Sequence, residues 1–142
     1  MIYTELTMKA MKIAYSAHKD QKDKAGVPYI FHPIHLAEQM NDEETTVIAL
    51  LHDVIEDTTI TQDDLLKEGI PLFLVDAIVL LTKDKKEDYF EYIQRVKSNE
   101  LAKIVKIEDL KHNLDETRLL TCTIKDKERR NKYKKSLKML TT

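Results

Sequence analysis

The sequence predicts an all-α protein, a single compact multi-helix bundle spanning residues 1–142. Glycine and proline are scarce, with 2 and 3 in the chain, and an all-β fold would need many more such residues for its turns. Apolar residues recur at helical spacing along most of the chain. No repeat, linker or change in composition marks a second domain, and the length is typical of one domain.

The first three helices follow from their caps and apolar positions. Thr4 is placed to cap the first, whose apolar stripe extends from Leu6 to Ala17 at helical spacing. Pro33 suits the first turn of the second helix, which extends to about Met40. The third helix is expected from Glu43 to Ile55, because apolar residues follow one another there with a helical period.

The next two helices are separated by a glycine and a proline. Thr61 followed by Asp64 resembles a capping box, which predicts a short helix that ends before Gly69. Pro71 then begins another helix, whose apolar residues extend to Leu81. Both predictions rest on residues that favour helix ends.

Three further helices are expected toward the C-terminus. Aromatic and branched residues at helical spacing predict one over Tyr89 to Val96, and a mostly apolar segment predicts another over Leu101 to Leu114. Thr123 with Asp126 forms a second capping-box pattern. It leads a basic terminal helix that carries Leu137 among its apolar residues.

Composition excludes several classes of protein. With 23 basic and 25 acidic residues the net charge is −2, which argues against a general nucleic-acid binder. The single cysteine, Cys122, allows no internal disulfide and indicates a reducing compartment. No apolar run approaches the ~18–20 residues needed to span a bilayer, and no apolar segment near the start resembles a signal peptide. We therefore expect a cytoplasmic protein without a membrane partner.

One stretch of the chain lacks positive charge. No lysine or arginine occurs between Lys24 and Lys67. The stretch holds nine acidic residues and three of the five histidines: Glu38, Asp42, Glu43, Glu44, Asp53, Glu56, Asp57, Asp63 and Asp64, with His32, His35 and His52. A solvated helix face normally intersperses lysine to relieve such carboxylates. The stretch therefore predicts that something else neutralises this negative charge.

The third helix places some of these groups on one side. Its apolar residues fill one arc, and the opposite arc holds His52, Asp53, Glu56 and Asp57. The apolar arc is expected to dock on the core, so the polar arc faces water or a cleft. A divalent metal would neutralise the carboxylates, and His and Asp are among its usual ligands. The alternative is an ordinary solvated His-Asp pair.

Further ligands must come from elsewhere in the chain. His32 precedes Pro33 at a predicted helix start, where a capping or core role is the alternative. Asp109 lies in a helix that is apolar over most of its circumference. A carboxylate buried there needs a partner, because an unpaired buried charge is costly. Spacing alone leaves that partner open between a metal and a cation such as Lys106 or Arg118.

A histidine, a His-Asp pair and a distant aspartate are the ligand pattern of the HD-domain metal phosphohydrolases, an all-helical family that the chain resembles. Its surrounding motifs are similar to those of RelA/SpoT-type alarmone hydrolases, from about His18 to Asn113. These motifs are Ala25–Pro33 (AGVPYIFHP), Ala49–Thr58 (ALLHDVIEDT), Leu81–Lys83 (LTK) and Val105–Asn113 (VKIEDLKHN). The chain is too short for the additional domains of the long family members, so it is similar to the small stand-alone hydrolases.

The resemblance implies a role for each matching residue. One divalent ion, typically Mn²⁺ in this family, is expected on His32, His52, Asp53 and Asp109. The attacking water is expected to be positioned and deprotonated by Glu56 and Asp57. The nucleotide site is expected to be lined by Lys24, Lys106 and Asn113. The family reaction removes pyrophosphate from the 3′ position of guanosine tetra- or pentaphosphate.

One position departs from the family pattern. An Arg-Lys pair often precedes the Gly-x-Pro-Tyr motif, whereas this chain has Asp23-Lys24. Losing an arginine that stacks on a base weakens or alters base recognition. A phosphohydrolase that acts on another nucleotide is therefore the alternative to the guanosine substrate.

The remaining features have mainly structural interpretations. His18 and His35 are expected to have capping or surface roles, and the alternative is that they support the site. The aromatic side chains Tyr89, Phe90 and Tyr92 are expected to pack in the core rather than stack on a base. The basic C-terminal helix is interpreted as a solvated helix, and the alternative is a non-catalytic module that binds partners through it. The expected partner is a small-molecule nucleotide, and a homo-oligomer is left open.

Overall fold

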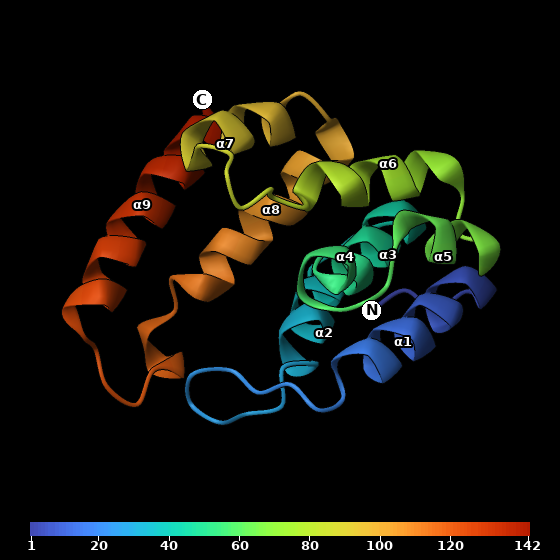
Figure 1. The fold of residues 1–142 in the computed structure, drawn as a ribbon, viewed down its shortest axis with the longest axis horizontal. Coiled ribbons are helices and arrows are strands. Elements are labelled where there is room, and N and C mark those ends of the chain that lie inside the picture. The colour runs from blue at the N-terminus through green and yellow to red at the C-terminus, as the bar shows by residue number, and fades with distance from the viewer.

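A computed structural model describes residues 1–142, which form nine α-helices and one short 3₁₀ helix, η1 (Figure 1). They are α1 Glu5–His18, α2 Phe31–Glu38, α3 Glu43–Leu51, α4 Val54–Asp57, α5 Gln62–Lys67, α6 Leu72–Leu81, α7 Tyr89–Lys97, α8 Glu100–Asn113, η1 Glu116–Arg118 and α9 Ile124–Thr141. The only strand-like pairing is an isolated antiparallel bridge between Lys22 and Pro28. The predicted all-α class is confirmed.

The most buried helix is α3. Every residue from Thr45 to Leu51 is buried, and α3 packs against α1, α2, α6 and α8. Figure 1 shows α8 as a long diagonal helix between this central group and α9, and α8 packs against both α3 and α9. The packing of α3 against α8 therefore supports the candidate site described below.

The predicted threonine caps are present. The side chains of Thr4, Thr61 and Thr123 each accept a hydrogen bond from the backbone N–H three residues on, at 3.1, 3.1 and 3.2 Å. At α5 and α9 the carboxylates of Asp64 and Asp126 accept from the N–H of the capping threonine at 2.9 Å, which completes both capping boxes. These caps determine where α1, α5 and α9 begin.

The expected continuous helix from Glu43 to Ile55 is wrong at one point. The helix is interrupted at His52 and Asp53, and a separate four-residue helix, α4, follows. Asp53 has φ −107° and ψ 0°, in the sparsely populated bridge region. The ring of His52 bonds to the carbonyl of Ala49 at 2.7 Å, which is the acceptor that the N–H of Asp53 would use in a continuous helix. The interruption therefore re-aims the residues that follow it.

The C-terminal helix packs along one flank of the bundle. α9 is the longest helix, with 18 residues, and it packs against α7 and α8 (Figure 1). Its composition is polar, and none of the helices combines the length and hydrophobicity needed to cross a bilayer.

Truncating a residue at the centre of α3 tests its role in the core. Leu50 is fully buried, whereas Leu72 at the start of α6 is 62% exposed. We expect Leu50→Ala to lower the free energy of unfolding by about 2–5 kcal/mol, because it removes buried apolar surface and leaves a cavity. Leu72→Ala is the matched control and should change it by less than about 0.5 kcal/mol. Urea denaturation measures both, and equal effects would contradict the central place of α3.

Candidate metal centre and active site

Three of the predicted metal ligands meet from three helices. The ligand atoms of His32 in α2, His52 at the end of α3 and Asp109 in α8 lie within 4.8 Å of one another. All three residues are buried. One carboxylate oxygen of Asp109, Oδ1, lies 2.8 Å from Nε2 of His32 and 3.7 Å from Nε2 of His52. The fold thus joins residues that are far apart in the sequence.

The fourth predicted ligand, Asp53, lies beside this group. Its Oδ2 is 3.0 Å from Nε2 of His52 and accepts a hydrogen bond from the hydroxyl of Tyr29. Burial opposes the charge of Asp53, but His52 outweighs it and lowers the pKa of the carboxyl to about 2. Asp53 is therefore ionised at the edge of the cluster.

The cluster requires positive charge at its centre. Nε2 of His52 is buried and has no well-oriented hydrogen bond, although two carboxylates lie close to it. Burial disfavours a charged ring, yet Asp53 and Asp109 outweigh burial and raise the pKa of His52. Imidazole nitrogens with carboxylate oxygens are the donors that divalent transition metals prefer. These residues therefore fit a divalent metal ion.

Neighbouring groups orient the two imidazoles. Nδ1 of His52 bonds to the Ala49 carbonyl, so this nitrogen carries the proton and Nε2 is directed to the cluster. Nδ1 of His32 lies 2.8 Å from Nδ1 of His112, whose ring also stacks on His35 with ring centroids 3.9 Å apart. Burial and Arg118 lower the pKa of His112 to about 4, so its ring is neutral at pH 7. Sequence reasoning missed His112.

The predicted catalytic pair lies on α4, directly after the interruption. Glu56 accepts a hydrogen bond from the backbone N–H of Lys83 at 2.7 Å. Burial, with Asp53 and Glu56 nearby, raises the pKa of Asp57 to about 6. Gln21 donates to the carbonyl of Asp57 at 2.8 Å and ties α4 to the segment after α1. Both carboxylates line a cavity of about 200 Å³ that also contacts Asp53 and Asp109.

Two of the predicted binding residues contact the cluster directly. Nζ of Lys106 lies 2.8 Å from Oδ2 of Asp109, and the side-chain amide of Asn113 donates to Oδ1 at 3.1 Å. Burial disfavours a charged carboxyl, but Lys106 and the histidines hold the pKa of Asp109 well below its usual range. Lys106 is thus one of the partners predicted for the carboxylate of Asp109. Arg118, the other predicted cation, donates a hydrogen bond to the side chain of Asn113 instead.

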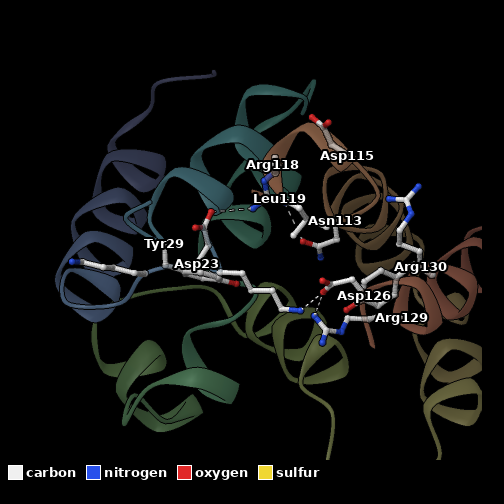
Figure 2. A pocket seen from close by; sticks show the side chains of 12 residues that line it. Asp23, Tyr29, Asn113, Asp115, Arg118, Leu119, Asp126, Arg129 and Arg130 are labelled. Atoms are coloured by element: carbon white, nitrogen blue, oxygen red, sulfur yellow. Dashed lines mark hydrogen bonds and ion pairs between the residues drawn. The ribbon is translucent and has the colours of Figure 1, made fainter. Parts of the chain in front are cut away.

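A larger cavity of about 280 Å³ adjoins this centre (Figure 2). Asn113 and Tyr133 line both cavities. Its walls come from the segment before α2, the end of α8, η1 with its flanking residues, and the first half of α9. They are formed by Lys22, Asp23, Lys24, Tyr29, Asn113, Asp115, Arg118, Leu119, Asp126, Arg129, Arg130 and Tyr133. The third predicted binding residue, Lys24, belongs to this cavity and not to the cluster.

The C-terminal helix contributes more to the site than its basic composition indicated. Arg129, Arg130 and Tyr133 line the larger cavity, whereas the sequence predicts a solvated helix here. The available signal was their spacing, because Asp126, Arg129, Arg130 and Tyr133 lie on one helix face at i, i+3, i+4 and i+7.

Asp23, the residue that departs from the family pattern, also lines this cavity. Its Oδ2 is 3.8 Å from the guanidinium of Arg118, and its Oδ1 accepts hydrogen bonds from the N–H groups of Ala25 and Val27 at 2.9 and 3.0 Å. Arg118 comes from η1, so a guanidinium reaches the cavity from a different segment (Figure 2). Asp23 thus shapes its loop and pairs with an arginine.

The structure also places the histidine and the tyrosines for which the sequence predicted structural roles. His18 is buried, 1% exposed, rather than at the surface; its Nδ1 lies 2.7 Å from Oε1 of Gln21 and its ring packs on Tyr29. Tyr92 packs in the core as expected, and its hydroxyl donates to the carbonyl of Leu81 at 2.6 Å. Tyr89 is half-buried and also lines the smaller cavity.

The fold and the site together define a class of protein. A helical bundle that brings a histidine, a His-Asp pair and a distant aspartate to one point has the arrangement expected of an HD-type domain. A metazoan SpoT orthologue, described as a protein that hydrolyses ppGpp, has this fold as well. Its structure aligns with a TM-score of 0.77 at 24% identity, over 99% of this chain and 87% of that one.

Sequence comparison places the chain within this class. It is 36% identical to the bifunctional (p)ppGpp synthase/hydrolase SpoT of Escherichia coli K12 over 136 residues, covering 86% of this chain. It is 42% identical to a guanosine-3′,5′-bis(diphosphate) 3′-pyrophosphohydrolase of Aquifex aeolicus over 67 residues. No family model matches. The chain spans 19% and 10% of the lengths of these two relatives. The resemblance to the RelA/SpoT-type hydrolase domain is therefore confirmed.

Removing one carboxylate charge tests whether the cluster binds metal. Asp109→Asn keeps the size of the side chain but removes the charge shared by both histidines, so we expect Mn²⁺ affinity to fall at least about tenfold. Asp115→Asn, an acid outside the cluster, is the matched control and should bind Mn²⁺ like the unaltered protein. Titration calorimetry with Mn²⁺ and elemental analysis measure both variants. Full metal occupancy in Asp109→Asn would contradict the site.

Proposed function

We propose that this protein is a metal-dependent hydrolase that removes the 3′-pyrophosphate from guanosine tetra- or pentaphosphate. The observation that carries the proposal is the meeting of His32, His52 and Asp109 beside Asp53, with a basic cavity adjoining them. The Aquifex relative is named for this reaction, and the E. coli relative is named a (p)ppGpp synthase/hydrolase. We further propose that residues 1–142 form one catalytic domain and act in the cytoplasm.

The metal would be held by four side chains. We assign His32, His52, Asp53 and Asp109 as its ligands and Mn²⁺ as the ion. When bound, such an ion lowers the pKa of a coordinated water and polarises a phosphoryl oxygen. Lys106 and Asn113 would keep the carboxylate of Asp109 in place, because both contact it. Their contacts would also limit the rotation of that carboxylate.

We assign Glu56 and Asp57 to the attacking water. A general base works best when its pKa lies near the operating pH, and burial raises the pKa of Asp57 to about 6. At pH 7 its carboxylate is ionised and able to accept the proton of a water. Glu56 is fixed by the N–H of Lys83, so its free oxygen would orient the water. The anchor from Gln21 to the carbonyl of Asp57 would hold α4 in register.

The nucleotide would lie across the two cavities. A substrate with one diphosphate at the 3′ and another at the 5′ position of its ribose needs cations at both diphosphates. Lys106 and Asn113 line the cavity at the metal centre, and Lys24, Arg129 and Arg130 line the adjoining one. Tyr29 and Tyr133 offer aromatic surface in that cavity for a base or ribose.

A second candidate keeps the chemistry and changes the nucleotide. Asp23 lines the cavity at the position where the family resemblance implies an arginine, and Arg118 reaches the same cavity from η1. A carboxylate and a guanidinium recognise a base edge differently from one stacking arginine. Comparing rates with guanosine and adenosine nucleotides that carry the same 3′ and 5′ phosphates separates the two candidates.

The proposed reaction is tested directly with guanosine tetraphosphate. Protein loaded with Mn²⁺ should release pyrophosphate and guanosine diphosphate, as measured by chromatography. Asp53→Ala should abolish turnover, since it removes a proposed ligand. Asp63→Ala, which replaces an exposed acid in α5, should retain full activity. Metal-loaded protein that releases no pyrophosphate from any nucleotide tested would refute the proposal.

The pKa of Asp57 predicts a pH dependence. Because the base must be ionised, kcat/KM should rise with pH below about 6 and level off above that value. A bound cation favours the ionised carboxylate, so the midpoint in the loaded enzyme is expected at or below pH 6. Asp57→Asn should remove this rise and lower kcat by about 10²–10⁴. A variant that keeps both the rate and the pH profile would exclude Asp57 as the base.

A further inference from the structure

The basic cavity is neutralised by carboxylates of its own chain. Lys24 pairs with Asp126 at 2.5 Å, Arg130 pairs with Glu116 at 3.1 Å, and the contact between Arg118 and Asp23 is longer, at 3.8 Å. Apart from Lys22, which makes no ion pair, the cations that an anionic ligand meets in this cavity already have carboxylate partners. To bind Lys24, Arg118 or Arg130, the ligand must weaken or exchange one of these contacts.

Asp126 is the most extensively bonded of these carboxylates. Its Oδ1 contacts Lys24 and lies 3.7 Å from the guanidinium of Arg129. Its Oδ2 accepts from the N–H and the hydroxyl of Thr123, each at 2.9 Å. Figure 2 shows Asp126 beside Arg129 within the cavity, with dashed lines marking its ion pairs. The side chain of Asp126 is 7% exposed, whereas that of Lys24 is 50% exposed.

We propose that Asp126 is a specificity-determining residue of the nucleotide site, because its carboxylate occupies the position between Lys24 and Arg129 that a ligand phosphate would take. The inference rests on the proposed function, in which Lys24 and this cavity bind the nucleotide. Asp126 lowers the affinity of the cavity for phosphate groups. The capping box holds it in place, so it cannot swing away when a ligand arrives.

The penalty depends on the charge of the ligand. Repulsion between Asp126 and a bound phosphate grows with the number of negative charges on that ligand. A diphosphate therefore loses more affinity than a monophosphate with the same base. Among the other acids of the cavity, Asp115 makes no ion pair and accepts only from the N–H and hydroxyl of Thr117, at 3.0 and 2.6 Å. Asp115 adds negative charge without holding a cation.

This difference supplies a matched pair of variants. Asp126→Asn and Asp115→Asn each remove one negative charge from the same cavity, but only the first frees Lys24 and Arg129. The asparagine at 126 still offers an oxygen to the N–H of Thr123, so α9 should stay capped; circular dichroism and thermal melting check this. Calorimetric titration with guanosine 5′-diphosphate and 5′-monophosphate, without metal, measures binding apart from hydrolysis.

We expect Asp126→Asn to tighten binding of the diphosphate about fivefold, and that of the monophosphate less, because freed cations become available to phosphate. Asp115→Asn should tighten either ligand less than about twofold. Adding Lys24→Gln to Asp126→Asn should remove most of the gain, since the gain acts through Lys24. The inference would be overturned if the gain in affinity survives this second substitution, or if the two single variants gain affinity equally. It would also be overturned if no variant binds the diphosphate.

The outcome is separable from that of the proposed function. Wild-type protein that hydrolyses guanosine tetraphosphate while Asp126→Asn binds the diphosphate unchanged would refute the role of Asp126 alone. Protein that hydrolyses no nucleotide while Asp126→Asn gains affinity through Lys24 would refute the hydrolase and leave the phosphate-binding role of the cavity standing.

Discussion

The site depends on one buried carboxylate, that of Asp109. Removing a charged carboxylate from water is tolerated only when partners surround it. Oδ1 of Asp109 lies 2.8 Å from His32 and accepts a hydrogen bond from Asn113 at 3.1 Å, and its Oδ2 lies 2.8 Å from Lys106. These partners come from α2 and α8, and His52 approaches from α3. The geometry of the centre therefore depends on how these three helices pack together.

Charges near this centre are divided between two adjoining cavities. Asp53 and the acidic residues of α4 line the smaller cavity, and Arg129 and Arg130 of α9 line the larger one. A metal would offset the first group, and the second group would meet the phosphates of a nucleotide. The pairing of Lys24 with Asp126 moderates the basic group, so this cavity is less attractive to anions than its count of lysine and arginine indicates.

The prediction of a continuous third helix was wrong, yet it grouped side chains that do lie close together in the structure. A wheel drawn for a continuous helix placed His52, Asp53, Glu56 and Asp57 on one face, and all four do lie at the centre or its cavity. The chain nevertheless turns at Asp53, because the His52 ring bonds to the Ala49 carbonyl. Such a bond is a local competition between side chain and backbone, and helical periodicity does not register it.

The sequence by itself determined the helical class and the capped starts of α1, α5 and α9, because caps and apolar periods are local signals. Its motifs also named the residues that we propose as metal ligands. Tertiary structure alone decided which groups meet. Contacts between segments distant in the chain make Asp109 face His32 rather than solvent. Such contacts also bring Lys24 to Asp126 and direct Arg129 into the larger cavity. Such contacts are set by how whole helices pack, and no spacing along one helix encodes them.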